Sequence, residues 1–241
     1  MKYFIDTEFI EGFHKPLFGK KRHFIDLISI GIVCEDGGEY YAISNEFNYK
    51  DADAWVKKNV ILPILKEGIA EYNDNAKKIN GGMPFLDLKI DAIKVIQRFN
   101  GKNNIQIARE IESFIYRGHQ RKTTGKRTGD LEDINGNDLE FYGYYADYDW
   151  VLFCSLFGRM IDLPKGFPMY CKDLKQIKDD FIEKNIGNVN LGFINPPDAI
   201  DIEHYLNDQV PQQNEHNSLA DAKWNKRLFE MIQTMNHTGG K

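Results

Sequence analysis

Hydrophobic and polar positions near the start of the chain form three short stretches that are typical of β-strands. Residues 2–9, 24–33 and 39–44 are rich in β-branched and aromatic side chains, which favour extended structure. Asp36-Gly37-Gly38 lies between the second and third stretches and predicts a hairpin turn. Residues 12–22 predict a loop between the first two strands, because they contain Gly12, Pro16, Gly19 and the basic run Lys20-Lys21-Arg22.

Helical spacing appears in five later segments. Residues 53–60 predict a helix ended by Pro63, and residues 105–116 carry isoleucines four positions apart. A predicted strand over 139–146 runs directly into a helix over 149–160, residues 170–183 predict a strand followed by a helix, and residues 218–235 predict the last helix. The remaining predictions are loops over 117–137 and 185–197 and a loose tail over 237–241.

The chain of 241 residues predicts a single domain over residues 1–236, in which the weakly patterned residues 66–138 form an insertion. Its net charge of -5 excludes a protein that coats nucleic acid electrostatically, so any role with nucleic acid must be local. Three widely spaced cysteines indicate free thiols in a reducing compartment. No apolar run approaches the roughly 20 residues of a membrane span. We therefore expect a cytoplasmic protein without a membrane partner.

Two acidic residues, Asp6 and Glu8, stand two positions apart in the first predicted strand. Because side chains alternate along a strand, both carboxylates face the same side, with their Cα atoms roughly 6.6 Å apart. Two such carboxylates repel each other unless a cation lies between them, so the pair predicts a divalent metal site. The alternative is an exposed edge strand whose acids face water.

Two more acids and a histidine stand where helices are predicted to begin. Asp149 follows the fourth predicted strand, where a carboxylate is also favoured simply as a helix cap. Asp221 falls in the first turn of the last helix. His216 must lie in the preceding loop, because five residues of helix turn through about 500° and would separate the two side chains. The competing interpretation is a capping box of Ser218 and Asp221.

The combination of these motifs resembles the DEDDh 3'-to-5' exonuclease superfamily, which has a ribonuclease H-like fold. The first three strands, with the sequences Tyr-Phe-Ile-Asp-Thr-Glu-Phe-Ile-Glu, Leu-Ile-Ser-Ile-Gly-Ile-Val and Glu-Tyr-Tyr-Ala-Ile-Ser, look like those of the bacterial DEDDh exoribonucleases first described from mycobacteria. The resemblance covers roughly residues 1–65, 139–160 and 212–232. It implies an α/β fold with a mixed β-sheet flanked by helices and a central insertion.

The resemblance further implies a two-metal phosphodiesterase. Asp6 would bridge two Mg²⁺ or Mn²⁺ ions, Glu8 and Asp221 would complete one ion site, and Asp149 would hold the other ion. His216 would be the general base, a role that suits an imidazole whose ordinary pKa lies near 6.5.

Some assignments within the resemblance stay open. Tyr145 stands where the superfamily often has Asn or His, and Asp147 is a second candidate for the role given to Asp149. Thr7 and Phe9 would line the pocket for the terminal nucleotide, although Phe9 as an ordinary core residue is the alternative. The five basic residues between 117 and 127 could hold phosphates or belong to a solvated loop.

The function implied by the resemblance is a metal-dependent 3'-5' exoribonuclease that acts on RNA with a free 3' end and releases nucleoside 5'-monophosphates. The residue chemistry alone supports only metal-assisted phosphodiester hydrolysis. The alternatives are a DNA-directed proofreading or repair exonuclease and a non-catalytic ribonuclease H-like module that binds nucleic acid. Related exonucleases often pair, so a homodimer is also open.

Overall fold

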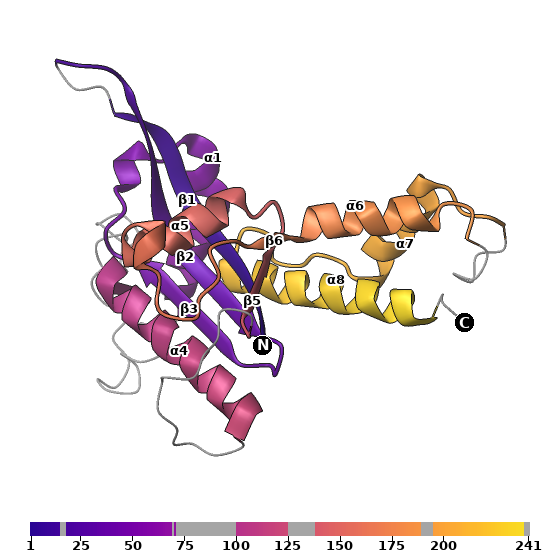
Figure 1. The fold of residues 1–241 in the computed structure, drawn as a ribbon. Coiled ribbons are helices and arrows are strands. Elements are labelled where there is room, and N and C mark those ends of the chain that lie inside the picture. The colour runs from indigo at the N-terminus through magenta and orange to yellow at the C-terminus, as the bar shows by residue number, and fades with distance from the viewer. Residues whose placement is uncertain (15–17, 69, 71–99, 125–137, 189–194, 239–241) are drawn as a thin grey trace, which may run out of the picture.

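A mixed six-stranded sheet with strand order β4-β3-β2-β1-β5-β6 forms the centre of the fold (Figure 1). The computed structural model describes residues 1–14, 18–68, 70, 100–124, 138–188 and 195–238. β2 runs antiparallel to both of its neighbours, β1 and β3, whereas β5 and β6 run parallel to β1, and β4 runs parallel to β3. The strands are β1 (Lys2–His14), β2 (Arg22–Cys34), β3 (Glu39–Ser44), β4 (Gly101–Lys102), β5 (Glu140–Gly143) and β6 (Lys172–Asp173).

Helices flank this sheet, which confirms the expected α/β class with a mixed sheet between helices. In Figure 1, α6, α7 and α8 extend to the right of the view, and α4 and α5 lie together toward the left. The helical elements are α1 (Ala54–Val56), the π turn η2 (Lys57–Ile61), α4 (Asn104–Thr124), α5 (Asp147–Phe157), α6 (Leu174–Asn185), α7 (Ala199–Gln209) and α8 (Ser218–Thr238), with short 3₁₀ turns at η1 (Tyr49–Asp51) and η4 (Met160–Asp162).

The first half of strand β1 is buried on both faces, and its alternating side chains separate two parts of the core. Tyr3 and Ile5 belong to the same cluster as the isoleucines of α4. On the other face, the ring of Phe4 packs on Phe229 of α8 at a centroid distance of 5.4 Å. Asp6 and Glu8 continue the Phe4 face, since side chains two apart point the same way. The two acids therefore lie on the side of the sheet that α8 covers.

Gly31 allows α8 to approach the sheet closely. A Cβ built on Gly31 would lie only 2.2 Å from the carbonyl oxygen of Ser218, so a side chain there requires the start of α8 to move. Gly31 is also the cross-strand neighbour of Asp6. The missing side chain thus brings the first turn of α8 against the strand pair that carries the first acid.

The predicted loop over residues 12–22 is too long at both ends, because β1 continues to His14 and β2 begins at Arg22, while residues 18–21 lie outside the strands as predicted. Gly12 is a strand residue paired with Phe24. The ring of Phe24 lies 2.9 Å from the position that a Cβ of Gly12 would occupy. Gly12 therefore makes room for a cross-strand aromatic ring instead of marking a turn, and the two strands extend well beyond the predicted ends.

Several helix ends also differ from the prediction. Residues 62–68 are helical, so Pro63 does not end the helix; a π turn immediately precedes this proline, which lacks the N–H that a regular turn would use. Residues 117–124 extend α4 where a loop was predicted, while Lys126 and Arg127 fall outside the described residues. His237 and Thr238 belong to α8 and not to a loose tail.

Two described elements lie inside the predicted insertion, over residues 66–138. β4 pairs with β3, and α4 places Ile107, Ile111 and Ile115 in the core with no exposed surface. Residues 100–124 are therefore an integral part of the sheet and its core. Helix α7 was not predicted. Among the described helices, none is long and apolar enough to cross a membrane.

Candidate active site

Three carboxylates from distant parts of the sequence converge at the sheet. Asp6 and Glu8 come from β1 and Asp221 from α8, and one oxygen of each lies within 4.8 Å of the others. Glu8 is 9% exposed and Asp221 is 6% exposed. The structure thus brings together three of the four acids that the sequence proposed as metal ligands.

The first turn of α8 holds Asp221 in this cluster. The N-terminal cap is Asn217, whose side-chain oxygen accepts a hydrogen bond from the Ala220 N–H at 3.1 Å. Ser218 instead shares a buried hydrogen bond with Ser29 of β2 at 3.0 Å. The capping box of Ser218 and Asp221 is therefore not formed, and the Asp221 carboxylate is available to the site.

Asp149 reaches the site from the start of α5 and is fixed by Thr7. The N–H and the hydroxyl of Thr7 both donate to Asp149 Oδ1, at 2.9 and 2.6 Å. The β1–β5 pairing ends at Phe4 and Tyr142, so the N–H of Thr7 is directed to a side chain and not to β5. Asp149 is 6% exposed, whereas Asp147, the alternative acid, is exposed at the helix start.

The sharp turn between β5 and α5 orients the helix that carries Asp149. Tyr145 adopts a left-handed backbone conformation with φ 56° in this turn. Asp173, the N-cap of α6, accepts a hydrogen bond from the Ala146 N–H at 3.1 Å. The sequence prediction did not include Asp173 in the site, because a helix-capping aspartate has no distinctive spacing relative to the other acids.

Burial and mutual repulsion make these carboxyl groups unusually weak acids. Burial first, and then the charges of Asp149, Glu8 and Asp221, hold the pKa of Asp6 well above its usual range. Burial, together with Asp221 and Asp149, raises the pKa of Glu8 to about 8. Burial also raises the pKa of Asp149 to about 7 against the opposing hydrogen bonds from Thr7. A divalent cation would relieve this repulsion, and an all-oxygen donor set suits Mg²⁺ or Mn²⁺.

His216 lies in the loop before α8, as its spacing from Asp221 requires. Its backbone has φ 67°, and its N–H donates to Asp221 Oδ2 at 2.9 Å. The opposite oxygen, Asp221 Oδ1, accepts from the side chain of Gln212 at 2.7 Å. The same carboxylate therefore joins the acidic cluster and fixes the loop that carries the imidazole.

Trp55 of α1 is a site residue that sequence reasoning missed. Its ring meets the ring of His216 edge-to-face, with centroids 4.7 Å apart and planes at 77°. Trp55 is 53% exposed, although a large aromatic side chain is ordinarily buried. A tryptophan in a predicted helix 161 positions away from the histidine carries no sequence signal for this contact.

The two predicted substrate residues have different surroundings. Thr7 is buried, and its hydroxyl is engaged with Asp149. Phe9 is partly buried and contacts Tyr148 of α5 edge-to-face at 5.5 Å. The geometry therefore makes Thr7 a residue that positions Asp149, whereas Phe9 lies beside the start of α5.

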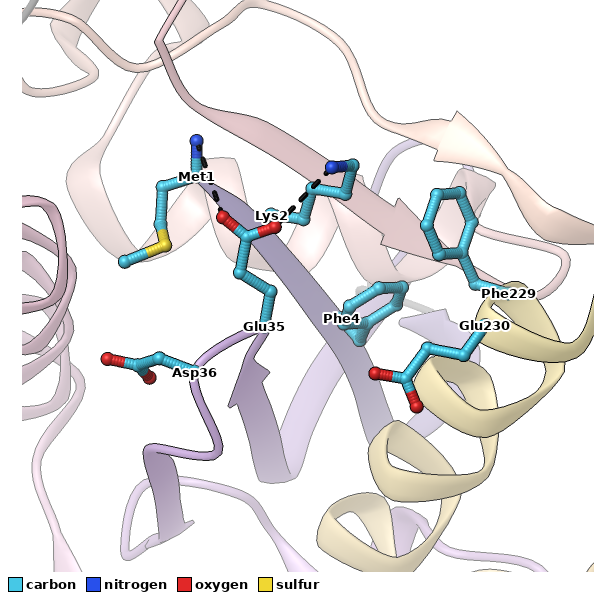
Figure 2. A pocket seen from close by; sticks show the side chains of 7 residues that line it. All are labelled: Met1, Lys2, Phe4, Glu35, Asp36, Phe229 and Glu230. Carbon is cyan, nitrogen blue, oxygen red and sulfur yellow. Dashed lines mark hydrogen bonds and ion pairs between the residues drawn. The ribbon is translucent and has the colours of Figure 1, made fainter. Parts of the chain in front are cut away.

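A cavity of about 570 Å³ opens at the other end of β1 (Figure 2). Figure 2 shows Glu35 near its centre, where it pairs with the amino group of Met1 at 3.9 Å and with Lys2 Nζ at 3.4 Å. None of the predicted site residues lines this cavity. The acidic cluster, not this cavity, is therefore the candidate active site.

The fold and the site together define a mixed α/β protein with a buried carboxylate centre suited to divalent cations. No protein-family model matches the chain. Over 240 residues the chain is 28% identical to the 3'-5' exoribonuclease Rv2179c of Mycobacterium tuberculosis strain H37Rv, covering 99% of this chain and 97% of that protein. The 3'-5' exoribonuclease MT2234.1 of strain CDC 1551 matches with the same identity and coverage.

These similarities confirm the predicted resemblance to the mycobacterial exoribonucleases. They also correct its extent. The sequence motifs covered three separate stretches and left out residues 66–138 and most of 185–211, whereas the aligned region spans 99% of the chain. The segments without recognisable motifs therefore align with the same relatives as the segments that carry the acids.

Proposed function

We propose that the chain is a divalent-cation-dependent 3'-5' exoribonuclease of the DEDDh type, which releases nucleoside 5'-monophosphates from RNA with a free 3' end. The convergence of the Asp6, Glu8 and Asp221 carboxylates beside His216 is the observation that carries the proposal. The names of the two full-length relatives support the enzyme class and the RNA substrate. We take the catalytic unit to be one domain over residues 1–236.

The acids are the proposed ligands of two Mg²⁺ or Mn²⁺ ions. Asp6, Glu8 and Asp221 would hold one ion, and Asp6 together with Asp149 would hold the other. When bound, such ions supply Lewis-acid chemistry and stabilise the negative charge of a phosphoryl group under attack. The chain's contribution is to keep these carboxylates buried and close together before a cation arrives, so that little rearrangement is needed on binding.

His216 is the proposed general base, which accepts a proton from the attacking water. Its backbone N–H donates to Asp221, and its ring packs edge-to-face against the indole of Trp55. General bases of this kind contribute about 10²–10⁴-fold to rate. Phe9 is proposed to face the terminal base, whose stacking on an aromatic ring does not depend on sequence. Thr7 acts on the reaction through Asp149.

The test is a digestion of single-stranded RNA labelled at its 5' end. With Mg²⁺ or Mn²⁺ the RNA should shorten as a ladder, the small product should be a nucleoside 5'-monophosphate, and EDTA should stop the reaction. A DNA strand of the same sequence serves as the parallel substrate, and faster shortening of the DNA would favour the repair-type alternative. Intact RNA and intact DNA under all these conditions would contradict the proposal.

Asp149 and Asp147 provide a matched pair of variants for the same assay. Asp149→Asn removes a buried charge that is held by Thr7, whereas Asp147→Asn removes an exposed charge two positions earlier. We expect Asp149→Asn to abolish turnover and Asp147→Asn to retain it. The reverse result would transfer the proposed metal-binding role to Asp147.

A further inference from the structure

The ends of β1 and β2 form a two-stranded arm that runs past the body of the molecule (Figure 1). The arm, as the structure describes it, comprises residues 12–14 and 18–24. Phe13 pairs with His23, and His14 pairs with Arg22, so the ladder continues to the end of both strands. A two-stranded ribbon is only marginally stable by itself, so contact with a bound molecule would stabilise the arm.

Charge on the arm is opposite to that of the chain as a whole. The arm, over residues 12–14 and 18–24, contains three lysines and arginines and no acidic residue, whereas the whole chain has a net charge of -5. Lys20, Lys21 and Arg22 are all exposed. A local concentration of cations on an acidic protein is complementary to a polyanion.

Two phenylalanine rings lie close to these cations in the sequence and are exposed to solvent. Phe18 is 93% exposed and Phe13 is 54% exposed, although burial of such side chains is ordinarily favourable. The Nζ of Lys21 lies 3.7 Å from the centroid of the Phe13 ring. His14 stacks on Phe24 with centroids 4.2 Å apart and planes at 19°. Exposed aromatic platforms interleaved with cations are what single-stranded nucleic acids bind, through base stacking and phosphate pairing.

The arm is also continuous with the candidate active site. Glu8 and His14 lie on the same strand, six residues apart, which corresponds to about 20 Å at the usual rise per residue. The pairing of β1 with β2 shifts register once, between Glu8 and Phe9, and then continues to His14. An RNA molecule whose 3' end lies at the acids could therefore extend along strand β1 to the arm.

We propose that this arm binds single-stranded RNA upstream of the 3' end held at the acids. The inference rests on the proposed function and adds to it a substrate class, which is RNA long enough to contact both the acids and the arm. Lys20, Lys21 and Arg22 pair with phosphates, and Phe18 and Phe13 stack on bases. The arm raises affinity for long strands and contributes nothing to a dinucleotide, which is too short to span the distance.

The first experiment measures RNA binding without turnover, in EDTA, by titrating a labelled single strand of about 16 nucleotides. In Lys20→Ser/Lys21→Ser, two lost phosphate contacts should reduce the slope of log affinity against log salt by about 1.4. Phe18→Ser should weaken binding about five-fold or more. The control Lys165→Ser/Lys184→Ser removes two exposed lysines from other parts of the chain and should leave the slope unchanged. Equal slopes in all three proteins would overturn the proposal.

The second experiment compares long and short substrates in the presence of Mg²⁺ or Mn²⁺. The arm variants should raise KM for the long RNA and leave the kinetics on a dinucleotide unchanged. An equal loss on both substrates would overturn the proposal, because it would show damage to the site itself. If the wild-type chain cleaved no RNA at all, the proposed function would fail, while the binding titration would still decide the role of the arm.

A second copy of this chain is the alternative occupant of the arm. Sedimentation of the wild-type chain and of Phe18→Ser distinguishes the two. The proposal expects the same oligomeric state for both proteins together with weaker RNA binding by the variant. Dissociation of an oligomer by Phe18→Ser with RNA affinity unchanged would make the arm an interface between copies and would overturn the proposal.

Discussion

At the scale of single residues, the candidate site depends on groups that serve two purposes at once. Asp221 joins the acidic cluster and also accepts the N–H of His216. Thr7 continues strand β1 and also fixes Asp149 with two hydrogen bonds. Because each of these contacts joins segments far apart in sequence, the positions of the acids and of the imidazole are set by the same few interactions.

Trp55 allows the position of His216 to be tested without touching an acid. Trp55→Ala removes an edge-to-face contact, and such pairs are worth about 0.5–1.5 kcal/mol. If that energy holds the imidazole in place for proton transfer, kcat should fall by about 2- to 12-fold with KM little changed. Trp55→Phe, which keeps an aromatic ring, should restore most of the rate. A rise in KM with unchanged kcat would show instead that Trp55 contacts the substrate.

At the scale of elements, the close approach of α8 to β2 decides whether the acids meet. Gly31→Ala would place a methyl group against the backbone of Ser218 and push the helix that carries Asp221 away from Asp6. We expect a loss of about 1–3 kcal/mol in the free energy of unfolding. Activity at a temperature where the variant is folded should fall by about 100-fold, since a displacement near 1 Å is that costly to catalysis.

Gly37→Ala is the matched control for this substitution. Gly37 lies in a turn with φ +89°, where a Cβ meets no other atom within 4 Å. The alanine should cost about 1–2 kcal/mol in backbone strain and leave activity unchanged. Comparable stability losses with very different activities would show that the displaced α8 causes the loss of activity in Gly31→Ala. Equal activities in the two variants would contradict it.

An ion pair between a buried lysine and a half-exposed glutamate joins α6 to α7. Lys178 is 3% exposed, and its Nζ lies 2.9 Å from Glu203 and 3.3 Å from the side-chain oxygen of Asn207. The hydrogen bond and charge of Lys178 lower the pKa of Glu203. The Glu203 carboxylate therefore stabilises the folded protein at pH values above the pKa that it has in the unfolded chain. This contribution is lost as the pH falls through its lower pKa in the folded protein.

Glu203→Gln tests this contribution. The variant should be less stable than the wild type by about 1–2 kcal/mol at pH 7, a value reduced because Glu203 is half exposed. The difference should shrink as denaturation is repeated at lower pH, and it should vanish once Glu203 is protonated in both states. Glu183→Gln, which alters an exposed residue of α6, is the control. A difference independent of pH would point to lost packing rather than lost charge.

At the scale of the whole molecule, local patterning predicted most of the elements but not their extent. Alternation and isoleucine spacing predicted the strands of the sheet other than β4, and the buried face of α4, because burial imposes these periods directly. The arm was missed because Gly12 is typical of a turn, whereas here it accommodates Phe24. Asp6 and Glu8 were predictable as a pair since one strand holds both. Trp55 was not, because only tertiary packing brings it to His216.

The acidic centre also has a consequence for the stability of the whole chain without metal. The pKa of Glu8 rises to about 8 and that of Asp149 to about 7, so the folded state holds protons that the unfolded state releases. Stability therefore falls as the pH rises from the unfolded pKa values, near 4, to the folded ones. In EDTA, we expect the Tm to decrease between about pH 5 and pH 8, by roughly 2–4 °C for each kcal/mol lost.

Divalent cations should reverse this loss, since they bind the ionised carboxylates of the folded state. At a concentration 100 times the Kd, Mg²⁺ or Mn²⁺ adds about 2.7 kcal/mol of stability. Glu8→Gln supplies the control, because it removes one buried charge. In EDTA at pH 8 it should melt at a higher temperature than the wild type, and it should gain less from Mn²⁺. A wild-type Tm that does not change with pH or Mn²⁺ would show that the carboxylates do not share one low-dielectric site, and the proposed cation chemistry would lose its physical basis.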